Sequence, residues 1–138
     1  MKYQITESQY KKLVLGYLNS VVSDFIFEDD DYEDNNWVDI LIDGNVNFGS
    51  LWFKTIFNRG MITDGCYEEL ALNEDFTQEF EQTIPIIMPK VFSQAVLEYF
   101  NSKTGRDCDC IEFKYTTEKY SITGDPFEEA YRYDAKKQ

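Results

Sequence analysis

Apolar residues recur every three or four positions in the N-terminal part of the chain. From Thr6 to about Ser23 they form one stripe of a helix, made of Tyr10, Leu13, Val14, Tyr17, Leu18, Val21 and Val22. Thr6 and Gln9 have the spacing of a capping box, in which each side chain satisfies a backbone N–H of the other residue. The pattern therefore predicts an amphipathic helix that begins next to Thr6.

Two further stretches have the same helical spacing. From Pro89 to near Gly105 the stripe consists of Val91, Phe92, Ala95, Val96, Tyr99 and Phe100. From Glu74 to Thr83, Phe76 and Phe80 lie four residues apart in an acidic segment. We expect a helix in each stretch.

Alternating or β-rich segments predict strands in two places. The segment 37–42 is rich in apolar and β-branched residues, and Asp43-Gly44 follows it as a turn signal, so that Val46 and Phe48 can form the returning strand of a hairpin. From Cys108 to Thr116, apolar and polar residues alternate. The segment from Leu51 to Asn58 allows two interpretations, a short helix capped by Ser50 or a strand that continues to Phe53.

This order of elements predicts the α+β class. We expect a small single domain over residues 1–138, with an antiparallel sheet of about three strands packed against two or three helices. Hydrophobic residues make up 43% of the chain, which is enough to form a core. From about residue 121 onward, where Gly124-Asp125-Pro126 marks a turn, we expect a loosely tethered tail.

Acidic residues outnumber basic ones by 26 to 13, which gives a formal net charge of −13. Binding to nucleic acid or to anionic membranes requires Lys and Arg, so neither is an expected direct partner. A protein with a basic surface, such as a nucleic-acid-binding protein, is the expected partner. The charge predicts an acidic loop at residues 24–36 and an acidic interaction surface made of Asp24, Glu28, Asp29, Asp30, Asp31, Glu33, Asp34, Glu68 and Glu69.

Candidate chemistry is sparse. The chain has no histidine, which removes the usual catalytic triads and His-containing zinc sites. A calcium loop that began at Asp29 would have Asp34 where the turn needs glycine and Ile40 where the ion needs glutamate. Asp39, Asp43 and Glu112 could converge as a carboxylate site only if the fold brought them together. We therefore expect no metal site, no cofactor and no catalytic residue.

The three cysteines favour a reducing environment. Cys108 and Cys110 lie too close along the chain for an easy mutual disulfide, and Cys66 makes the count odd, so we expect buried or half-buried free thiols. The first residues lack an apolar signal core, and no apolar run approaches the ~20 residues of a membrane span. We expect a soluble, intracellular protein. Aromatic residues at 37, 48, 52, 53 and 57 belong either to the core or to a protein-binding patch.

The opening segment Met1–Leu13, MKYQITESQYKKL, resembles the start of small uncharacterised proteins of tailed bacteriophages, in which a short polar lead runs into a capped amphipathic helix. The resemblance implies a phage origin and a place in the host cytoplasm or in the virion. Together with the charge, it favours a non-enzymatic acidic protein that binds a basic protein surface, one form being an inhibitor that mimics nucleic-acid charge. The alternatives are a structural or accessory protein of the virion or its assembly and, third, a small metal-dependent enzyme.

Overall fold

The computed structural model describes residues 5–29, 35–53, 68–120 and 122–135. Within these ranges the chain forms three helices and six strands, in the order α1 (Glu7–Val21), β1 (Val22–Asp29), β2 (Asn35–Ile42), β3 (Asn45–Phe53), β4 (Glu68–Leu72), α2 (Glu74–Glu81), α3 (Pro89–Thr104), β5 (Cys110–Tyr120) and β6 (Pro126–Asp134). No helix of the described residues is long and apolar enough to cross a membrane.

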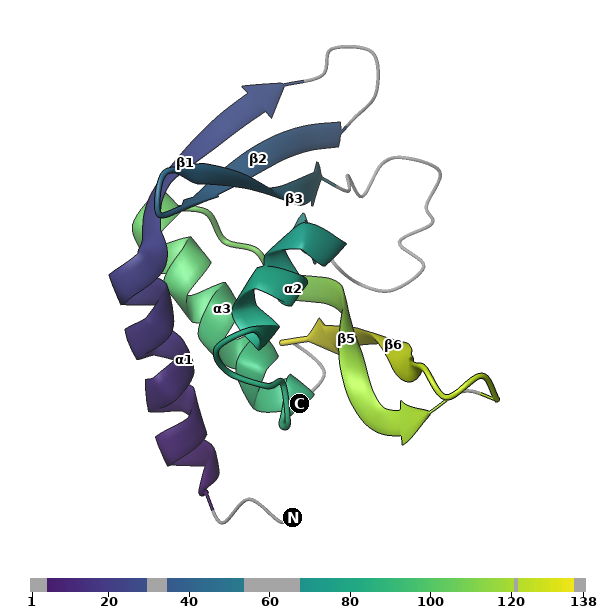
Figure 1. The fold of residues 1–138 in the computed structure, drawn as a ribbon. Helices are drawn as coiled ribbons and strands as arrows, with labels where there is room; N and C mark the ends of the chain where they lie inside the picture. Colours follow the sequence, from purple (N-terminus) through teal and green to yellow (C-terminus); the bar gives the residue numbers. More distant parts are fainter. Residues whose placement is uncertain (1–4, 30–34, 54–67, 121, 136–138) are drawn as a thin grey trace.

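The six strands form one sheet in which neighbours along the chain are also neighbours in space. The order is β1-β2-β3-β4-β5-β6. All adjacent pairs are antiparallel except β4 and β5, which are parallel. Helices α2 and α3 lie between β4 and β5 in the chain, and such a crossover is what a parallel pair requires. In Figure 1, β1, β2 and β3 lie above the helices, and β5 and β6 lie to their right.

The core fills the space between the helices and the inner face of the sheet. Alternate strand residues point inward and are buried, among them Val38, Ile40, Ile42, Leu70, Ile111 and Phe113. Phe92 of α3 lies between Phe80 of α2 and Phe113 of β5, with ring centroids 4.8 and 4.9 Å away and edge-to-face geometry. These three rings join two helices and the sheet in one cluster.

Helix α1 forms as its sequence predicts. The backbone N–H of Gln9 donates to Oγ1 of Thr6 at 3.1 Å, and the N–H of Thr6 donates to Oε1 of Gln9 at 2.9 Å, which completes the capping box. The inner stripe packs against α3, with Tyr10, Val14 and Leu18 buried. The Tyr10 hydroxyl donates to the carbonyl of Pro85 at 2.9 Å, and burial raises the pKa of this hydroxyl to about 12.

The predicted α+β class, the single domain and the three helices are confirmed. The expected number of strands, about three, is wrong because the described residues form a sheet of six. For the segment from Leu51 to Asn58, the strand interpretation is correct as far as Phe53, and the rest lies outside the described residues.

Two segments predicted to be irregular are strands. The acidic loop expected at residues 24–36 is instead occupied by β1 up to Asp29 and by β2 from Asn35 onward. The tail expected from residue 121 contains β6, which pairs with β5. In β1 the reason is packing: the ring of Phe25 lies 5.3 Å from that of Phe100, and Phe27 lies 6.2 Å from the same ring. Asp24 and Glu28 of β1 occupy alternate positions to these rings, on the other side of the strand.

Candidate protein-binding face

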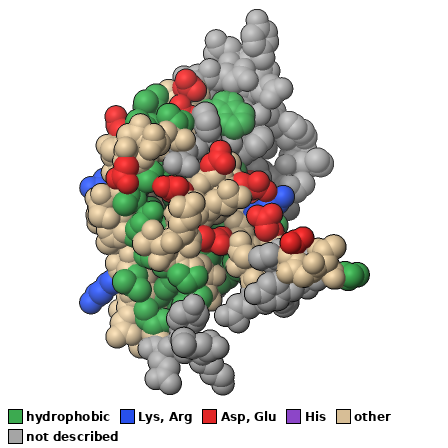
Figure 2. All heavy atoms as spheres, viewed as in Figure 1, with side chains coloured by type: hydrophobic (Ala, Val, Ile, Leu, Met, Phe, Trp, Pro, Cys, Tyr) green, Lys and Arg blue, Asp and Glu red, His purple; other side chains and the backbone are tan. Residues whose placement is uncertain are grey.

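The side of β1, β2 and β3 that points away from the helices carries a mixture of acidic and apolar side chains. We call it the β1–β3 outer face. Strand alternation and register place its described side chains together: Asp24, Ile26 and Glu28 of β1, Trp37, Asp39 and Leu41 of β2, and Val46 of β3. Figure 2 shows hydrophobic side chains between acidic ones in the upper part of the view, where these strands lie.

Large apolar side chains of this face remain exposed. Ile26 is 45% exposed, Trp37 is 42% exposed and Val46 is 48% exposed. By contrast, the neighbouring inner residues Val38 and Ile40 are at most 2% exposed. Apolar side chains that gather at the surface in this way are typical of protein-binding sites. Of the two interpretations of the aromatic residues, Trp37 therefore fits the surface patch and not the core.

Carboxylates surround the apolar side chains. Asp24 and Glu28 are exposed and lie two residues before and after Ile26, so that all three point to the same side of β1. Asp24 pairs in register with Leu41, and Glu28 pairs with Trp37. Each of these carboxylates thus lies beside an apolar side chain of β2, and a partner covering them would meet charge and apolar surface together.

Asp39 lies in the middle of the face. It is the register partner of Ile26 on β1 and of Phe48 on β3. Its Oδ1 atom is buried and has no hydrogen-bond partner, although the residue as a whole is only half-buried. A buried acceptor without a donor costs about 1–3 kcal/mol. Because this atom is buried, a Lys, Arg or N–H donor of a bound molecule would reach it only after the half-buried carboxylate rotated toward the surface.

The structure brings together only part of the predicted acidic surface. Asp24 and Glu28 lie on the β1–β3 outer face, and Asp29 ends β1, with its side chain not described. Glu68 and Glu69 begin β4, which is separated from β1 by two strands. The remaining members lie outside the described residues: Asp30, Asp31, Glu33 and Asp34.

Glu69 makes an internal ion pair instead of a surface site. It is only 8% exposed, and its Oε2 accepts a hydrogen bond from Nε of Arg132 at 2.7 Å. Glu68 lies beside the thiol of Cys108, with 3.8 Å between its Oε2 and the sulfur. Both carboxylates are therefore engaged with side chains of the neighbouring segments, and their part in the predicted interaction surface is not supported by the geometry.

The described residues show no arrangement suited to catalysis by a thiol or a metal. Burial, together with the adjacent Glu68 carboxylate, raises the pKa of the Cys108 thiol, so this thiol stays protonated and unreactive. The expectation of free thiols holds for Cys108 and is wrong for Cys110, which is disulfide-bonded. Among the described residues, no group of three or more acidic or cysteine side chains could hold a metal ion.

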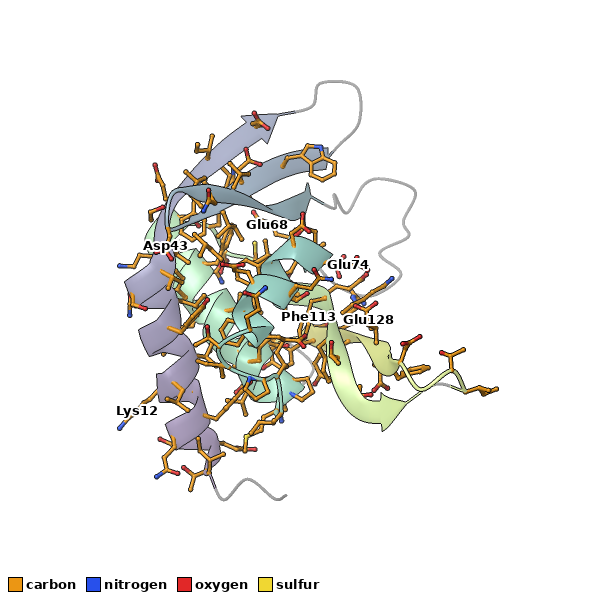
Figure 3. The ribbon with its side chains drawn as sticks, in the orientation of Figure 1. Lys12, Asp43, Glu68, Glu74, Phe113 and Glu128 are labelled. Atoms are coloured by element: carbon orange, nitrogen blue, oxygen red, sulfur yellow. The ribbon has the colours of Figure 1, made fainter. Side chains whose placement is uncertain are left out.

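The carboxylates of Asp39, Asp43 and Glu112 do not converge. Asp43 lies at the turn between β2 and β3, where its N–H donates to the carbonyl of Val21 at 2.8 Å (Figure 3). Glu112 is on β5, and two strands separate β5 from β2. With strands spaced about 4.8 Å apart, Glu112 is on the order of 14 Å from Asp39 across the sheet.

Two features of the face were missed from the sequence, namely the outward position of Ile26 and the unpartnered oxygen of Asp39. The alternation of Asp24, Ile26 and Glu28 with Phe25 and Phe27 was the available signal for the first. The second depends on tertiary packing. Comparison with family models, with curated proteins and with solved structures found no match.

Proposed function

We propose that the protein acts without catalysis, by binding a basic partner protein through the β1–β3 outer face. The observation that carries this proposal is the unpartnered Oδ1 of Asp39, in a surface where Ile26 and Trp37 are also exposed. The half-buried Asp39 carboxylate would rotate toward the surface and accept a hydrogen bond from a cationic side chain of the partner, while apolar side chains of the partner would cover the exposed ones.

The charge of the whole chain supports the same partner. A net charge of −13 attracts a basic surface over a distance set by the ionic strength and accelerates the encounter. Asp24 and Glu28, which are both exposed, would provide this attraction at the face itself. Binding is therefore expected to weaken as salt is raised.

Mimicry of nucleic-acid charge is a narrower form of this proposal. A nucleic-acid backbone presents charge without interruption. On the β1–β3 outer face, by contrast, Ile26, Trp37 and Val46 lie between the carboxylates. This mixture favours a partner that offers apolar as well as basic side chains, and such a partner need not bind nucleic acid.

A second candidate function is that of a structural or accessory protein of a virion or its assembly, as the phage-like N-terminal segment implies. The exposure of Ile26, Trp37 and Val46 favours it, because assembly interfaces are built from such side chains. Self-association would distinguish the two functions. Light scattering that shows a monomer under physiological salt favours capture of a different protein, and a concentration-dependent oligomer favours assembly.

A pull-down from bacterial lysate tests the binding function. The immobilised protein is incubated with the lysate at low salt. Bound proteins are then eluted with high salt, and these salt-eluted proteins are identified by mass spectrometry. Trp37→Ala removes the largest exposed apolar side chain of the face, and Phe127→Ala on β6 is its control, since Phe127 is 47% exposed.

We expect salt-eluted basic proteins that are lost with Trp37→Ala and kept with Phe127→Ala. A captured set that is the same for both variants, or that resists high salt, would contradict the proposal.

A further inference from the structure

β1 lies at one edge of the sheet that the described residues form. β1 is the first strand of the sheet, and β2 is its partner on one side. On its other side, none of the described strands pairs with it. Backbone N–H and C=O groups along such an edge can pair with an added strand.

The inner side of β1 is held firmly against α3. Phe25 packs against Tyr99 and Phe100, with ring centroids 6.2 and 5.3 Å away. Phe27 contacts Phe100, and the guanidinium of Arg106 lies 5.1 Å from the centre of the Phe27 ring. An added strand would therefore meet a backbone that is already positioned, which lowers the entropy cost of binding.

The charges of β1 disfavour pairing with a second copy of itself. If two β1 strands paired antiparallel around Ile26, Asp24 of each strand would lie opposite Glu28 of the other. Like charges directly opposite each other destabilise a strand pair, whereas opposite charges in the same places stabilise it. A segment with Lys or Arg at two positions four residues apart meets Asp24 and Glu28 with the favourable sign.

The residues of β1 between Asp24 and Glu28 indicate which residues the added segment needs between its two cations. Phe25, Ile26 and Phe27 are apolar, and Ile26 and Phe27 keep 45% and 37% of their surface exposed at this edge. Apolar residues of an added strand would cover both side chains, one on each side of the sheet. The pattern that fits β1 is thus a cation, three apolar residues and a second cation.

From these observations, and resting on the binding function proposed above, we propose that the partner adds an extended segment of this pattern to the free edge of β1. The segment extends the sheet by one strand. Its Lys or Arg side chains lie opposite Asp24 and Glu28, and its backbone pairs with that of β1. Main-chain hydrogen bonds give this mode of binding its affinity, and the side-chain pattern gives it selectivity.

A synthetic peptide of seven residues provides the probe, with Lys at its second and sixth positions, Val at the three positions between them and Thr at both ends. A control peptide has the same side chains, but the nitrogens of its three central amides are methylated. Methylation removes the backbone donors and leaves the charge unchanged. Affinity is measured by titration calorimetry with the full-length protein, and hydrogen exchange of the β1 amides is measured with and without the peptide.

We expect the parent peptide to slow exchange in β1 and the methylated peptide to bind at least about tenfold more weakly, because main-chain hydrogen bonds are lost. In Asp24→Asn/Glu28→Gln protein, the parent peptide should bind roughly three- to tenfold more weakly, because two charge pairs are lost. A third peptide, with Glu in place of both Lys residues, should not bind.

Equal affinity of the parent and methylated peptides would overturn strand addition and leave the salt-sensitive capture through Trp37 standing. No binding of the parent peptide would also overturn strand addition. If sedimentation of the protein alone shows a dimer in which the β1 amides are already protected, the edge is occupied by a second copy and the proposal is wrong. The binding function itself fails separately, through the Trp37→Ala pull-down.

Discussion

Ile26 of β1 and Asp39 of β2 are register partners on the outer side of the sheet, and beside Ile26 one oxygen of Asp39 is buried without a hydrogen-bond partner. An acidic residue in this position is unfavourable for folding, since strands prefer β-branched and aromatic residues and a buried acceptor needs a donor. The same residue is favourable for binding a cation. Stability and binding therefore place opposite demands on Asp39.

Replacing Asp39 by valine should change stability and partner binding in opposite directions. Asp39→Val removes the unpaired oxygen and introduces a residue that favours strands, so we expect the free energy of unfolding to rise by about 1 kcal/mol. The same variant should lose the salt-eluted partners. Urea denaturation and the pull-down measure the two effects. A clear loss of stability would mean that Asp39 supports the fold itself, and the central role given to its oxygen would then be wrong.

The ion pair between Arg132 and Glu69 is expected to stabilise the fold. Arg132→Met would remove the Arg132 cation from Glu69, which is nearly buried, and breaking a fully buried pair by removing one partner costs about 3–5 kcal/mol. Because the Arg132 side chain is 33% exposed, we expect a smaller loss, of about 2 kcal/mol.

A surface ion pair provides the control for Arg132→Met. Lys11 Nζ lies 2.6 Å from Oε2 of Glu98, and both side chains are more than a third exposed. Lys11→Met should therefore change the free energy of unfolding by at most about 1 kcal/mol in urea denaturation. Equal effects of the two variants would show that Glu69 does not depend on Arg132.

We expect Tyr10 to make the free energy of unfolding fall at alkaline pH. Its pKa is about 12 in the folded protein against 10.0 ordinarily, so both states keep the proton below pH 10. Between pH 10 and about pH 12 the unfolded chain releases this proton while the folded one retains it, and the free energy of unfolding decreases.

Tyr10→Phe should reduce this decrease. Urea denaturation at several pH values from about 9 to about 12, the range in which a tyrosine hydroxyl titrates, measures the free energy of unfolding. At neutral pH we expect the variant to lose about 1 kcal/mol, because the hydrogen bond to the carbonyl of Pro85 is absent. An unchanged alkaline slope would mean that Tyr10 is not the group responsible.

The helices were predictable because their signals are local. Thr6 and Gln9 are three residues apart and form the cap of α1 that their spacing predicts. Pro89 begins α3, and Gly105 ends it in a left-handed conformation with φ of 74°. Each of these signals depends on residues within a few positions of each other, and the structure preserves all of them.

The missed strands depend on partners far away in the sequence. In β1, the density of acids concealed the alternation of Phe25 and Phe27 with outward residues, and both rings point inward because they pack against Phe100 of α3. In β6, Tyr133 is buried against the sheet opposite Ile111. Long-range pairing thus determined both the number of strands and the composition of the outer face. Composition alone predicted a basic partner but not the surface to which that partner would bind.

Two double variants with the same change of net charge distinguish the position of the acids on the β1–β3 outer face from the total charge of the chain. Asp24→Asn/Glu28→Gln removes two acids from the β1–β3 outer face. Glu112→Gln/Glu128→Gln removes two exposed acids from β5 and β6, at the other end of the same sheet; Figure 3 labels Glu128 there. Both raise the formal charge from −13 to −11, because each neutralises two carboxylates.

The most direct test of the proposed binding face is the amount of each captured protein that the two double variants retain in the low-salt pull-down, quantified by mass spectrometry. We predict that Asp24→Asn/Glu28→Gln loses most of the salt-eluted proteins and that Glu112→Gln/Glu128→Gln retains them as the unaltered protein does. Equal retention by both variants would contradict the role of the β1–β3 outer face in binding, because the total charge would then matter and the position of the acids would not.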